Sequence, residues 1–453
     1  MTDAQPLLIL INPWIYDFAA YDLWSKPLGL LTLATFLRNR GFRIHLIDCL
    51  DIHHPGMTGN PFLVRPVRRR YGTGKFFRER AARPEVLRDV PRSYSRYGIS
   101  TQLFIEELRA AERPAAILVT SLMTYWYPGV QEVIRMARTI HPGTPVILGG
   151  IYARLCREHA IRKSGADEVV SAADTPDFSV LLGALGKFGV TPEPSPQPFL
   201  YPSYDLLHGL DYVCLRTSSG CPFRCQYCAS PFLNPEFTAR NPHEVLEEIL
   251  FWQANYGVEE FAFYDDALLV GFESHLRVLL EQVVNMKRPI RFHTPNALHV
   301  REITPSVANL LFASGFKTIR LGLETADMAL HHDLDGKVSS GEFERAIENL
   351  RLAGFDRRDL GAYILAGLPG QSVESVAGSA QYVVRTGATP YIAEYSPIPH
   401  TPLWEKAVSC SDYDLVSEPL FHNNTLLPCW NEEQRRRFED VKREVIRIRR
   451  DDG

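Results

Sequence analysis

The 453-residue sequence has no apolar run that approaches the roughly 18 residues needed to cross a membrane as a helix. It also lacks the basic stretch and long hydrophobic core that a secretory signal peptide requires. A net charge of only −4 provides no general attraction for nucleic acid. Hydrophobic residues make up 45% and charged residues 23%, the proportions of globular domains. These features predict a cytoplasmic protein with neither a membrane nor a nucleic-acid partner.

Cysteines are few, and no second C-x2-C pair accompanies the one that is present, as a zinc site would require. Five of the 8 cysteines are scattered, and the other three lie together in the stretch Cys221-Pro-Phe-Arg-Cys225-Gln-Tyr-Cys228. In a cytoplasmic chain, such a cluster indicates metal or redox chemistry rather than a disulfide framework.

The first part of the chain, residues 1–190, alternates short apolar runs with helical patterns. This alternation predicts an α/β domain with a doubly wound, Rossmann-like parallel sheet. A basic insertion interrupts it at about 53–100, and we expect either a solvated loop or a clamp for an anion or substrate. Residues 191–203 are rich in proline and predict a stiff linker.

Residues 204–400 repeat a strand and then a helix, which predicts a partial (β/α)6 barrel. The expected barrel strands span 212–217, 259–264, 289–294, 317–323, 360–367 and 389–395. Asn241-Pro242 and Thr304-Pro305 are typical helix starts, with a capping side chain followed by proline. Residues 401–453 predict a short α-rich C-terminal cap.

The cysteine cluster follows the first barrel strand, where catalytic loops of such barrels lie. Three thiolates can bind three irons of a [4Fe–4S] cluster and leave the fourth iron open to a ligand. Three other interpretations exist: a zinc site, a ferredoxin-type electron carrier or sensor, and inert buried cysteines. A carrier needs a fourth cysteine nearby, and Cys214 falls inside the expected strand.

This C-x3-C-x2-C loop on a six-step barrel resembles the radical SAM superfamily over about 210–400. The resemblance implies that the open iron binds S-adenosylmethionine (SAM), and that one electron from an external flavodoxin- or ferredoxin-type donor cleaves it to a 5′-deoxyadenosyl radical. It also implies SAM contacts from Tyr227, Asp265, Asp266, Asn296, Glu324 and Ile364. Asp265 and Asp266 stand where the family often has Gly-Gly-Glu, so which of them contacts SAM stays open. Ile364 is either an apolar shelf for adenine or plain core.

A Rossmann-like domain before such a barrel resembles the cobalamin-binding class of this superfamily. In corrinoid domains, a serine loop and a glycine pair accommodate the nucleotide tail, because it needs a hydroxyl and a close backbone approach. The cobalamin contacts that this implies are Trp14, Ser121, Tyr125, Gly149 and Gly150. A DxHxxG string at 51–56 follows the second strand rather than the first, so we expect no cobalt ligand from His53. The alternative is a nucleotide-type fold with an unrelated site.

Together these patterns predict a cobalamin-dependent radical SAM enzyme that methylates an unactivated carbon of a small-molecule or peptide substrate. One alternative is a radical SAM oxidoreductase, mutase or cyclase that does not use cobalamin. An alternative of another class is an iron–sulfur electron carrier or sensor, which would have no use for a SAM-binding set of carboxylates. No catalytic residue is assigned except Cys429, which we expect to be either a hydrogen donor to the reaction or a buried structural thiol.

Overall fold

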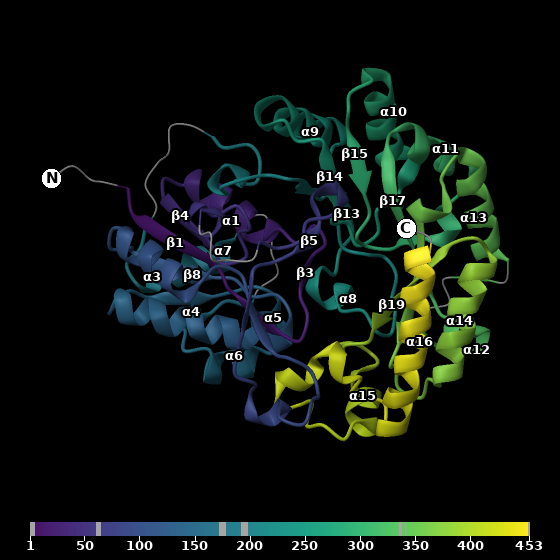
Figure 1. Cartoon of the computed structure of the whole chain (residues 1–453). Coiled ribbons are helices and arrows are strands. Elements are labelled where there is room, and N and C mark those ends of the chain that lie inside the picture. The colour runs from purple at the N-terminus through teal and green to yellow at the C-terminus, as the bar shows by residue number, and fades with distance from the viewer. Residues whose placement is uncertain are drawn as a thin grey trace. The chain divides into compact units, whose positions relative to one another are not determined.

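In the computed structural model, the chain forms two compact units, whose elements Figure 1 labels. The first comprises Met1–Asp211 with Ser417–Leu420, and the second Tyr212–Val416 with Phe421–Gly453. The structure describes residues 5–59, 65–171, 178–191, 198–334, 338–339 and 341–451. Residues 192–197 of the expected linker lie outside this set. No helix in the described part is both long and apolar enough to span a bilayer.

A parallel sheet with the order β10-β9-β8-β1-β4 lies at the centre of the first unit. Its strands are β1 (Leu7–Asn12), β4 (Arg43–Asp48), β8 (Ala116–Val119), β9 (Val146–Leu148) and β10 (Glu168–Val169). Every residue of β1 is buried, as expected for a parallel strand covered on both faces. The chain runs from β1 to β4 and then returns to β8 on the other side of β1. Ligands of doubly wound sheets bind at such a reversal of strand order.

Helices connect these strands and cover the sheet. They are α1 (Leu28–Arg38), α2 (Pro55–Thr58), α3 (Thr101–Ala110), α4 (Tyr127–Ile140), α5 (Ile151–Leu155), α6 (Arg157–Lys163) and α7 (Ser179–Lys187). α1 and α7 share one hydrophobic cluster with the sheet, through residues such as Leu37 and Leu185. α3 starts at Ser100, whose Oγ accepts a hydrogen bond from the Leu103 amide at 3.2 Å, a standard N-cap.

The basic insertion takes part in two small antiparallel sheets. β7 (Ser95–Tyr97) pairs with β2 (Ile15–Asp17) and β6 (Arg78–Arg80), and β3 (Tyr21–Asp22) pairs with β5 (Gly74–Lys75). Both sheets therefore join the insertion to the segment that follows β1. These strands have only two or three residues, too few to produce a recognisable period in the sequence.

The second unit is built on parallel strands in the order β11-β14-β15-β17-β18-β19, with β16 also pairing with β17. The strands are β11 (Val213–Leu215), β14 (Glu260–Phe263), β15 (Arg291–His293), β16 (Leu298–His299), β17 (Phe316–Glu324), β18 (Leu360–Ala366) and β19 (Thr389–Glu394). The first and last strands of this order do not pair, so the barrel is partial. The predicted α/β fold class, a doubly wound sheet followed by a partial barrel, is confirmed.

The helices of this unit are α8 (Ser230–Leu233), α9 (Pro242–Tyr256), α10 (Leu276–Met286), α11 (Pro305–Ala313), α12 (Met328–Leu334), α13 (Glu342–Ala353) and α14 (Val373–Arg385). The two predicted helix starts are found. Asn241 Oδ1 accepts from the His243 amide at 3.0 Å, and Thr304 Oγ1 accepts from the Val307 amide at 3.2 Å.

The C-terminal segment adds α15 (Trp404–Cys410) and α16 (Glu432–Asp451), and α16 packs against α14 and β19. Lys442 Nζ lies 2.9 Å from a carboxylate oxygen of Glu394 at the end of β19. The Trp430 indole donates to the Gln371 carbonyl oxygen at 3.0 Å. The helical tail is therefore attached to the last two strand–helix steps of the barrel.

Candidate functional site

The cysteine loop begins beyond β11 and lies between two short strands that pair with each other, β12 (Ser218–Ser219) and β13 (Thr238–Ala239). Gly220 directly follows β12 with φ +78°, and a Cβ there would lie 2.1 Å from the carbonyl oxygen of Glu236. Only glycine fits such a close backbone approach in the left-handed region. The turn at Gly220 therefore places Cys221 at the start of the loop.

The three cysteines supply three sulfur ligands from one short segment. Cys221 and Cys225 are buried, whereas Cys228 is half-buried and its Sγ accepts from the Ser230 amide at 3.4 Å. Within the described residues, no three His, Cys, Asp or Glu side chains converge closely enough to bind one metal ion. In an iron–sulfur cubane each thiolate binds a different iron, so the three need not converge on one point. This donor set fits a cubane better than a single zinc ion.

Three contacts hold the cysteine loop against the rest of the barrel unit. The Gln226 amide donates to the Leu334 carbonyl at 2.9 Å, and the Gln226 carbonyl accepts from the Leu403 amide at 3.0 Å. The Phe223 ring stacks on His299, with 3.8 Å between ring centroids. Tyr227 packs on the hydrophobic cluster that contains Leu365 and Leu368, next to the loop after β18. The predicted adenine contacts Tyr227 and Ile364 are thus on neighbouring segments.

Asp265, which follows β14, is 1% exposed and contacts the chain just before the cysteine loop. Its carboxylate accepts from the Thr217 amide at 3.1 Å, from Thr217 Oγ1 at 2.7 Å and from Ser218 Oγ at 2.6 Å. Burial raises the pKa of Asp265, and these hydrogen bonds act against that effect. The side chain of Asp265 is therefore occupied in holding the segment that leads to Cys221.

Asp266 has different surroundings, although it is the next residue. It is half-buried, and no hydrogen bond or ion pair joins its side chain to another described residue. Asn296, beyond β15, lies beside it in the fold, because Asn296 Nδ2 donates to the Asp265 carbonyl at 3.1 Å. The structure thus brings the polar groups after β14 and β15 to one place and leaves Asp266 as the available carboxylate.

Glu324 ends β17 with φ +63°, a conformation that residues other than glycine rarely adopt. Its side chain is largely buried, and its backbone pairs with Ile364 on β18 beyond a shift in register. Ile364 is fully buried. Strained backbone of this kind is concentrated at functional sites. The carboxyl ends of four successive strands therefore bring together Asp265, Asn296, Glu324 and Ile364.

The residues at these four strand ends form what we call the polar rim. Two residues that the sequence did not indicate support this rim. His275 is buried, its Nε2 lies 3.0 Å from the Thr217 carbonyl, and burial lowers its pKa. The neutral ring therefore donates from Nε2 to Thr217. Gln371 Oε1 accepts from the Gly367 amide at 3.0 Å, and Gln371 Nε2 donates to the Leu365 carbonyl at 2.9 Å. The role of His275 has no local signal, because it contacts a residue 58 positions away along the chain, whereas Gln371 bonds residues only four and six positions before it.

Cys429 lies in the hydrophobic cluster that contains Leu365, Leu403 and Tyr395. It is 8% exposed, and burial together with the neighbouring Cys410 thiol raises its pKa. This placement fits the structural-thiol alternative, in which Cys429 stays protonated.

In the first unit, the loops after β8 and β9 meet at Ser121. Ser121 Oγ donates to the Gly149 carbonyl at 2.6 Å. Gly150 has φ +93°, and a Cβ there would lie 2.3 Å from the Ser121 carbonyl oxygen. The predicted Ser121, Gly149 and Gly150 are thus in contact, and a side chain at Gly150 would push the two loops apart. This close approach fits the backbone arrangement expected for a nucleotide tail.

The two aromatic residues predicted for cobalamin contact are part of the core. The Trp14 indole is 1% exposed and donates to the Ile99 carbonyl at 2.8 Å. Tyr125 is 5% exposed and packs edge-on against Trp126. A small cavity does lie at the reversal of strand order, between Asn12–Ile15 after β1 and Ser121–Met123 after β8. Trp14 and Trp126 are among the residues that line this cavity, together with Ser121, whereas Tyr125 is not.

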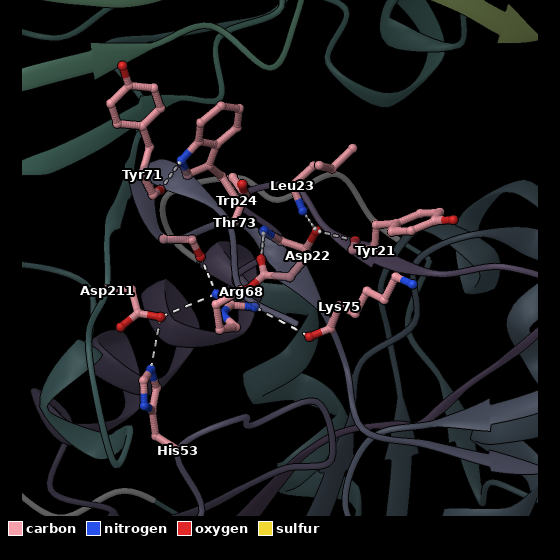
Figure 2. A network of polar contacts seen from close by, with 12 residues as sticks. Tyr21, Asp22, Leu23, Trp24, His53, Arg68, Tyr71, Thr73, Lys75 and Asp211 are labelled. Atoms are coloured by element: carbon pink, nitrogen blue, oxygen red, sulfur yellow. Dashed lines mark hydrogen bonds and ion pairs between the residues drawn. The ribbon is translucent and has the colours of Figure 1, made fainter. Parts of the chain in front are cut away.

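His53, in the DxHxxG string, belongs to a network of charged groups (Figure 2). Its Nε2 lies 3.2 Å from Asp211 Oδ2, and Arg68 Nη2 lies 3.2 Å from the same oxygen. Arg68 also pairs with the buried Asp22 at 2.9 Å. In this structure His53 therefore faces a carboxylate of its own unit.

Comparison with known proteins matches a family model to part of each unit. A family model for the radical SAM superfamily matches residues 215–383, and one for the B12 binding domain matches residues 96–180. These matches confirm that the chain is an enzyme of the predicted kind. They also support the predicted cofactors, a [4Fe–4S] cluster, SAM and cobalamin.

Individual relatives are distant. A cytidylyl-2-hydroxyethylphosphonate methyltransferase of Streptomyces wedmorensis is 23% identical, over 84% of this chain and 77% of the relative. An uncharacterized methyltransferase of Pyrococcus horikoshii is 23% identical over 65% of this chain and 70% of its own length. The hopanoid C-2 methylase of Rhodopseudomonas palustris is 25% identical, but only 40% of its length is matched.

Solved structures show the same fold. The radical SAM methyltransferase TsrM of Kitasatospora setae, with cobalamin and a [4Fe–4S] cluster bound, has a TM-score of 0.66 at 14% identity, over 98% of this chain and 89% of that chain. The cobalamin-dependent radical enzyme OxsB has a TM-score of 0.55 at 12% identity, over 92% and 57%. The chain therefore carries a B12-binding domain followed by a radical SAM domain, as the two family models show.

Proposed function

We propose that this enzyme transfers a methyl group to an unactivated carbon of a small organic substrate. When bound, the cluster and SAM supply a 5′-deoxyadenosyl radical that abstracts hydrogen, and cobalamin supplies the methyl group. The observation that carries the proposal is that one chain holds both the three-cysteine loop with its polar rim and the Ser121–Gly150 contact.

In the barrel unit, each rim residue has a proposed part in binding. Cys221, Cys225 and Cys228 hold three irons, and the fourth is left for SAM. Asp266 accepts hydrogen bonds from the SAM ammonium group, since charge-assisted hydrogen bonds are strong and Asp265 is already engaged. Asn296 and Glu324 bind the polar parts of SAM. Ile364, with Tyr227, provides the apolar surface for adenine.

In the first unit, Ser121, Gly149 and Gly150 allow close backbone approach of the cobalamin nucleotide tail. The neighbouring Leu122 and Met123 are 36% and 48% exposed and line the small cavity beyond the carboxyl end of β8, where a large ligand would cover them. Curated relatives that are methyltransferases support the methyl-transfer outcome. The electron comes from an external flavodoxin- or ferredoxin-type donor, and a peptide is the second substrate class to test.

The test is anaerobic reconstitution with iron, sulfide and hydroxocobalamin, followed by incubation with SAM and a reductant. We expect about four irons and one cobalt per chain, the stoichiometry of one open cubane and one corrinoid. We also expect two products from SAM, 5′-deoxyadenosine from radical cleavage and S-adenosylhomocysteine from methyl transfer. Deoxyadenosine without stoichiometric cobalt would overturn the methyl-transfer proposal in favour of an enzyme that does not use cobalamin. Four irons without either product would favour an electron carrier.

A further inference from the structure

A cavity of about 410 Å³ lies in the first unit, between the basic insertion and the segment after β1. It is lined by residues 18–21 and 65–67 and by Lys75, Phe76, Arg78 and Tyr97. Its volume falls in the usual range of small-molecule sites. It is separate from the small cavity beside Ser121, which is lined by other residues.

The lining of this cavity has positive charge only. Arg65, Lys75 and Arg78 contribute three cations, and none of the described lining residues is acidic. Concave surfaces with one sign of charge attract ligands of the opposite sign. No ion pair within the described part of the chain neutralises Lys75 or Arg78.

The carboxylates nearest in sequence are engaged elsewhere. Asp17 accepts from the Phe18 amide at 2.6 Å and from the Trp126 indole at 2.7 Å. Asp22 pairs with Arg68, and Glu79 pairs with Arg96. The positive charge of the lining is therefore left for a ligand.

Aromatic side chains also line the cavity. Phe18, Phe76 and Tyr97 are each less than 10% exposed, and Tyr97 Oη donates to the Phe18 carbonyl at 3.2 Å. Tyr21 lies at the rim with its ring about half exposed. These aromatic side chains suit a ligand in which an apolar or aromatic body is attached to an anionic group.

The wall that carries Lys75 is held rigidly (Figure 2). Arg68 bonds Asp22 and Asp211, and the Lys75 amide donates to the Val67 carbonyl at 3.0 Å. A Cβ at Gly74 would lie 2.5 Å from that same carbonyl oxygen, so the two segments are in close contact. A pre-organised wall lowers the entropic cost of binding.

We propose that this cavity binds a small molecule with a phosphate or carboxylate group next to an apolar or aromatic body. The proposal goes beyond methyl transfer and does not depend on it, because every lining residue belongs to the first unit and the cavity is formed without the barrel or its cysteine loop. Two sources share this chemistry: the phosphate of a cobalamin nucleotide tail, and a separate anionic metabolite such as the substrate.

The test uses phenyl phosphate as the probe and calorimetric titration of the full chain at low salt. We expect phenyl phosphate to bind and phenol not to bind. Lys75→Gln and Arg78→Gln should each weaken binding about tenfold, as loss of one charge-assisted contact does. Both side chains are exposed, so the variants should fold normally, which circular dichroism will check.

Arg69→Gln is the matched control. Arg69 belongs to the same insertion, is exposed and does not line the cavity, so its substitution removes the same charge and should change binding less than twofold. Equal weakening by Arg69→Gln and Lys75→Gln would overturn the proposal, because it would mean diffuse attraction rather than a site. Equal binding of phenol, or no binding of phenyl phosphate, would do the same.

Competition distinguishes the two sources. Displacement of phenyl phosphate by cobalamin, but not by cobinamide, which lacks the nucleotide, would support the site and assign it to the cofactor phosphate. Retention of phenyl phosphate in the presence of either corrinoid would support the site and assign it to a separate anionic metabolite.

Discussion

Asp265 and Asp266 differ in what their carboxylates already bind. Asp265 receives hydrogen bonds from Thr217 and Ser218 at the start of β12 and is almost fully buried. Asp266 is half-buried and is joined to no other described side chain. A buried carboxylate with several donors holds structure, since removing it would leave those donors without a partner. A partly exposed carboxylate beside it is free to meet a cation.

Asp266→Asn should therefore impair SAM binding, whereas Asp265→Asn should lower stability. Asp266→Asn should raise the SAM concentration for half-saturation at least tenfold with an unchanged melting temperature. Asp265→Asn should lower the free energy of unfolding by roughly 2–3 kcal/mol, because it weakens hydrogen bonds to a charged acceptor. SAM titration and thermal melting of both variants measure this. An unchanged titration for Asp266→Asn would exclude it as the ammonium partner.

Cys225→Ala should abolish the cluster absorbance and the formation of 5′-deoxyadenosine, since the cubane loses one of its three protein ligands. Far-ultraviolet circular dichroism should stay native, because the loop is also held by Phe223 and by the backbone of Gln226. Cys410→Ala, an exposed cysteine outside the motif, is the control and should keep both signals. Deoxyadenosine production by Cys225→Ala would contradict the assignment.

Asp48, at the end of β4, should make stability depend on pH. Burial, with the neighbouring Asp51, raises the pKa of Asp48 to about 6. The folded state therefore holds this proton more tightly than the unfolded chain, where the pKa is about 4. Its contribution to stability is present below pH about 4 and is lost as pH rises to about 6. Above that pH the charged Asp48 should cost about 3 kcal/mol, an order-of-magnitude figure.

Asp48→Asn keeps the oxygen that accepts from Asn12 and from the Leu50 amide, but it removes the titration. The variant should gain stability over the wild type as pH rises from 4.5 to 6.5, and the difference should then level off. Urea unfolding at several pH values measures this gain. A difference that does not vary with pH would show that Asp48 keeps its ordinary pKa.

At the scale of elements, glycines determine how closely the functional loops approach each other. Gly150 lets the loop after β9 touch Ser121, and Gly220 lets the chain turn into the cysteine loop. Both have positive φ and a backbone oxygen within 2.5 Å of where a Cβ would stand. Neither position tolerates a side chain without moving backbone, in contrast to a helical glycine with open space around it.

Gly150→Ala should therefore reduce bound cobalamin at least tenfold by separating the loops after β8 and β9. Gly183→Ala is the matched control, because Gly183 lies in α7 with no atom near the added methyl group. That control should bind cobalamin normally and gain about 0.5–1 kcal/mol of stability from better helix propensity. Visible absorbance of cobalamin retained after gel filtration measures the effect. Normal retention by Gly150→Ala would exclude these loops as the tail site.

At the scale of the whole molecule, the two units have separate sheets and separate proposed cofactor sites. A ligand stabilises the part of the structure that it contacts. Hydrogen exchange should therefore show SAM protecting amides at 264–268, 294–297 and 322–326 in the reconstituted enzyme. Aquacobalamin should instead protect 12–15, 119–123 and 148–152. SAM protection centred on the second set of segments would contradict the proposed division.

Much of this protein could be predicted from its sequence, because the relevant signals are local. Buried parallel strands such as LLILI at 7–11 are continuous apolar runs, and helix starts such as Asn241-Pro242 depend on adjacent residues. The cysteine motif has a fixed spacing for the same reason: its three ligands share one loop. These features indicated the fold class and the class of cofactor chemistry, and the family matches confirm both.

What only the tertiary structure decided depends on residues that are distant along the chain. It engages Asp265 rather than Asp266 with Thr217, joins the buried Trp14 indole to the Ile99 carbonyl, and brings His275 to Thr217. It also shapes the basic insertion into a lined cavity through pairs such as Arg68 with Asp211. Local periodicity does not predict such contacts, because a hydrogen bond or a ring contact depends on which distant segments the fold brings close together.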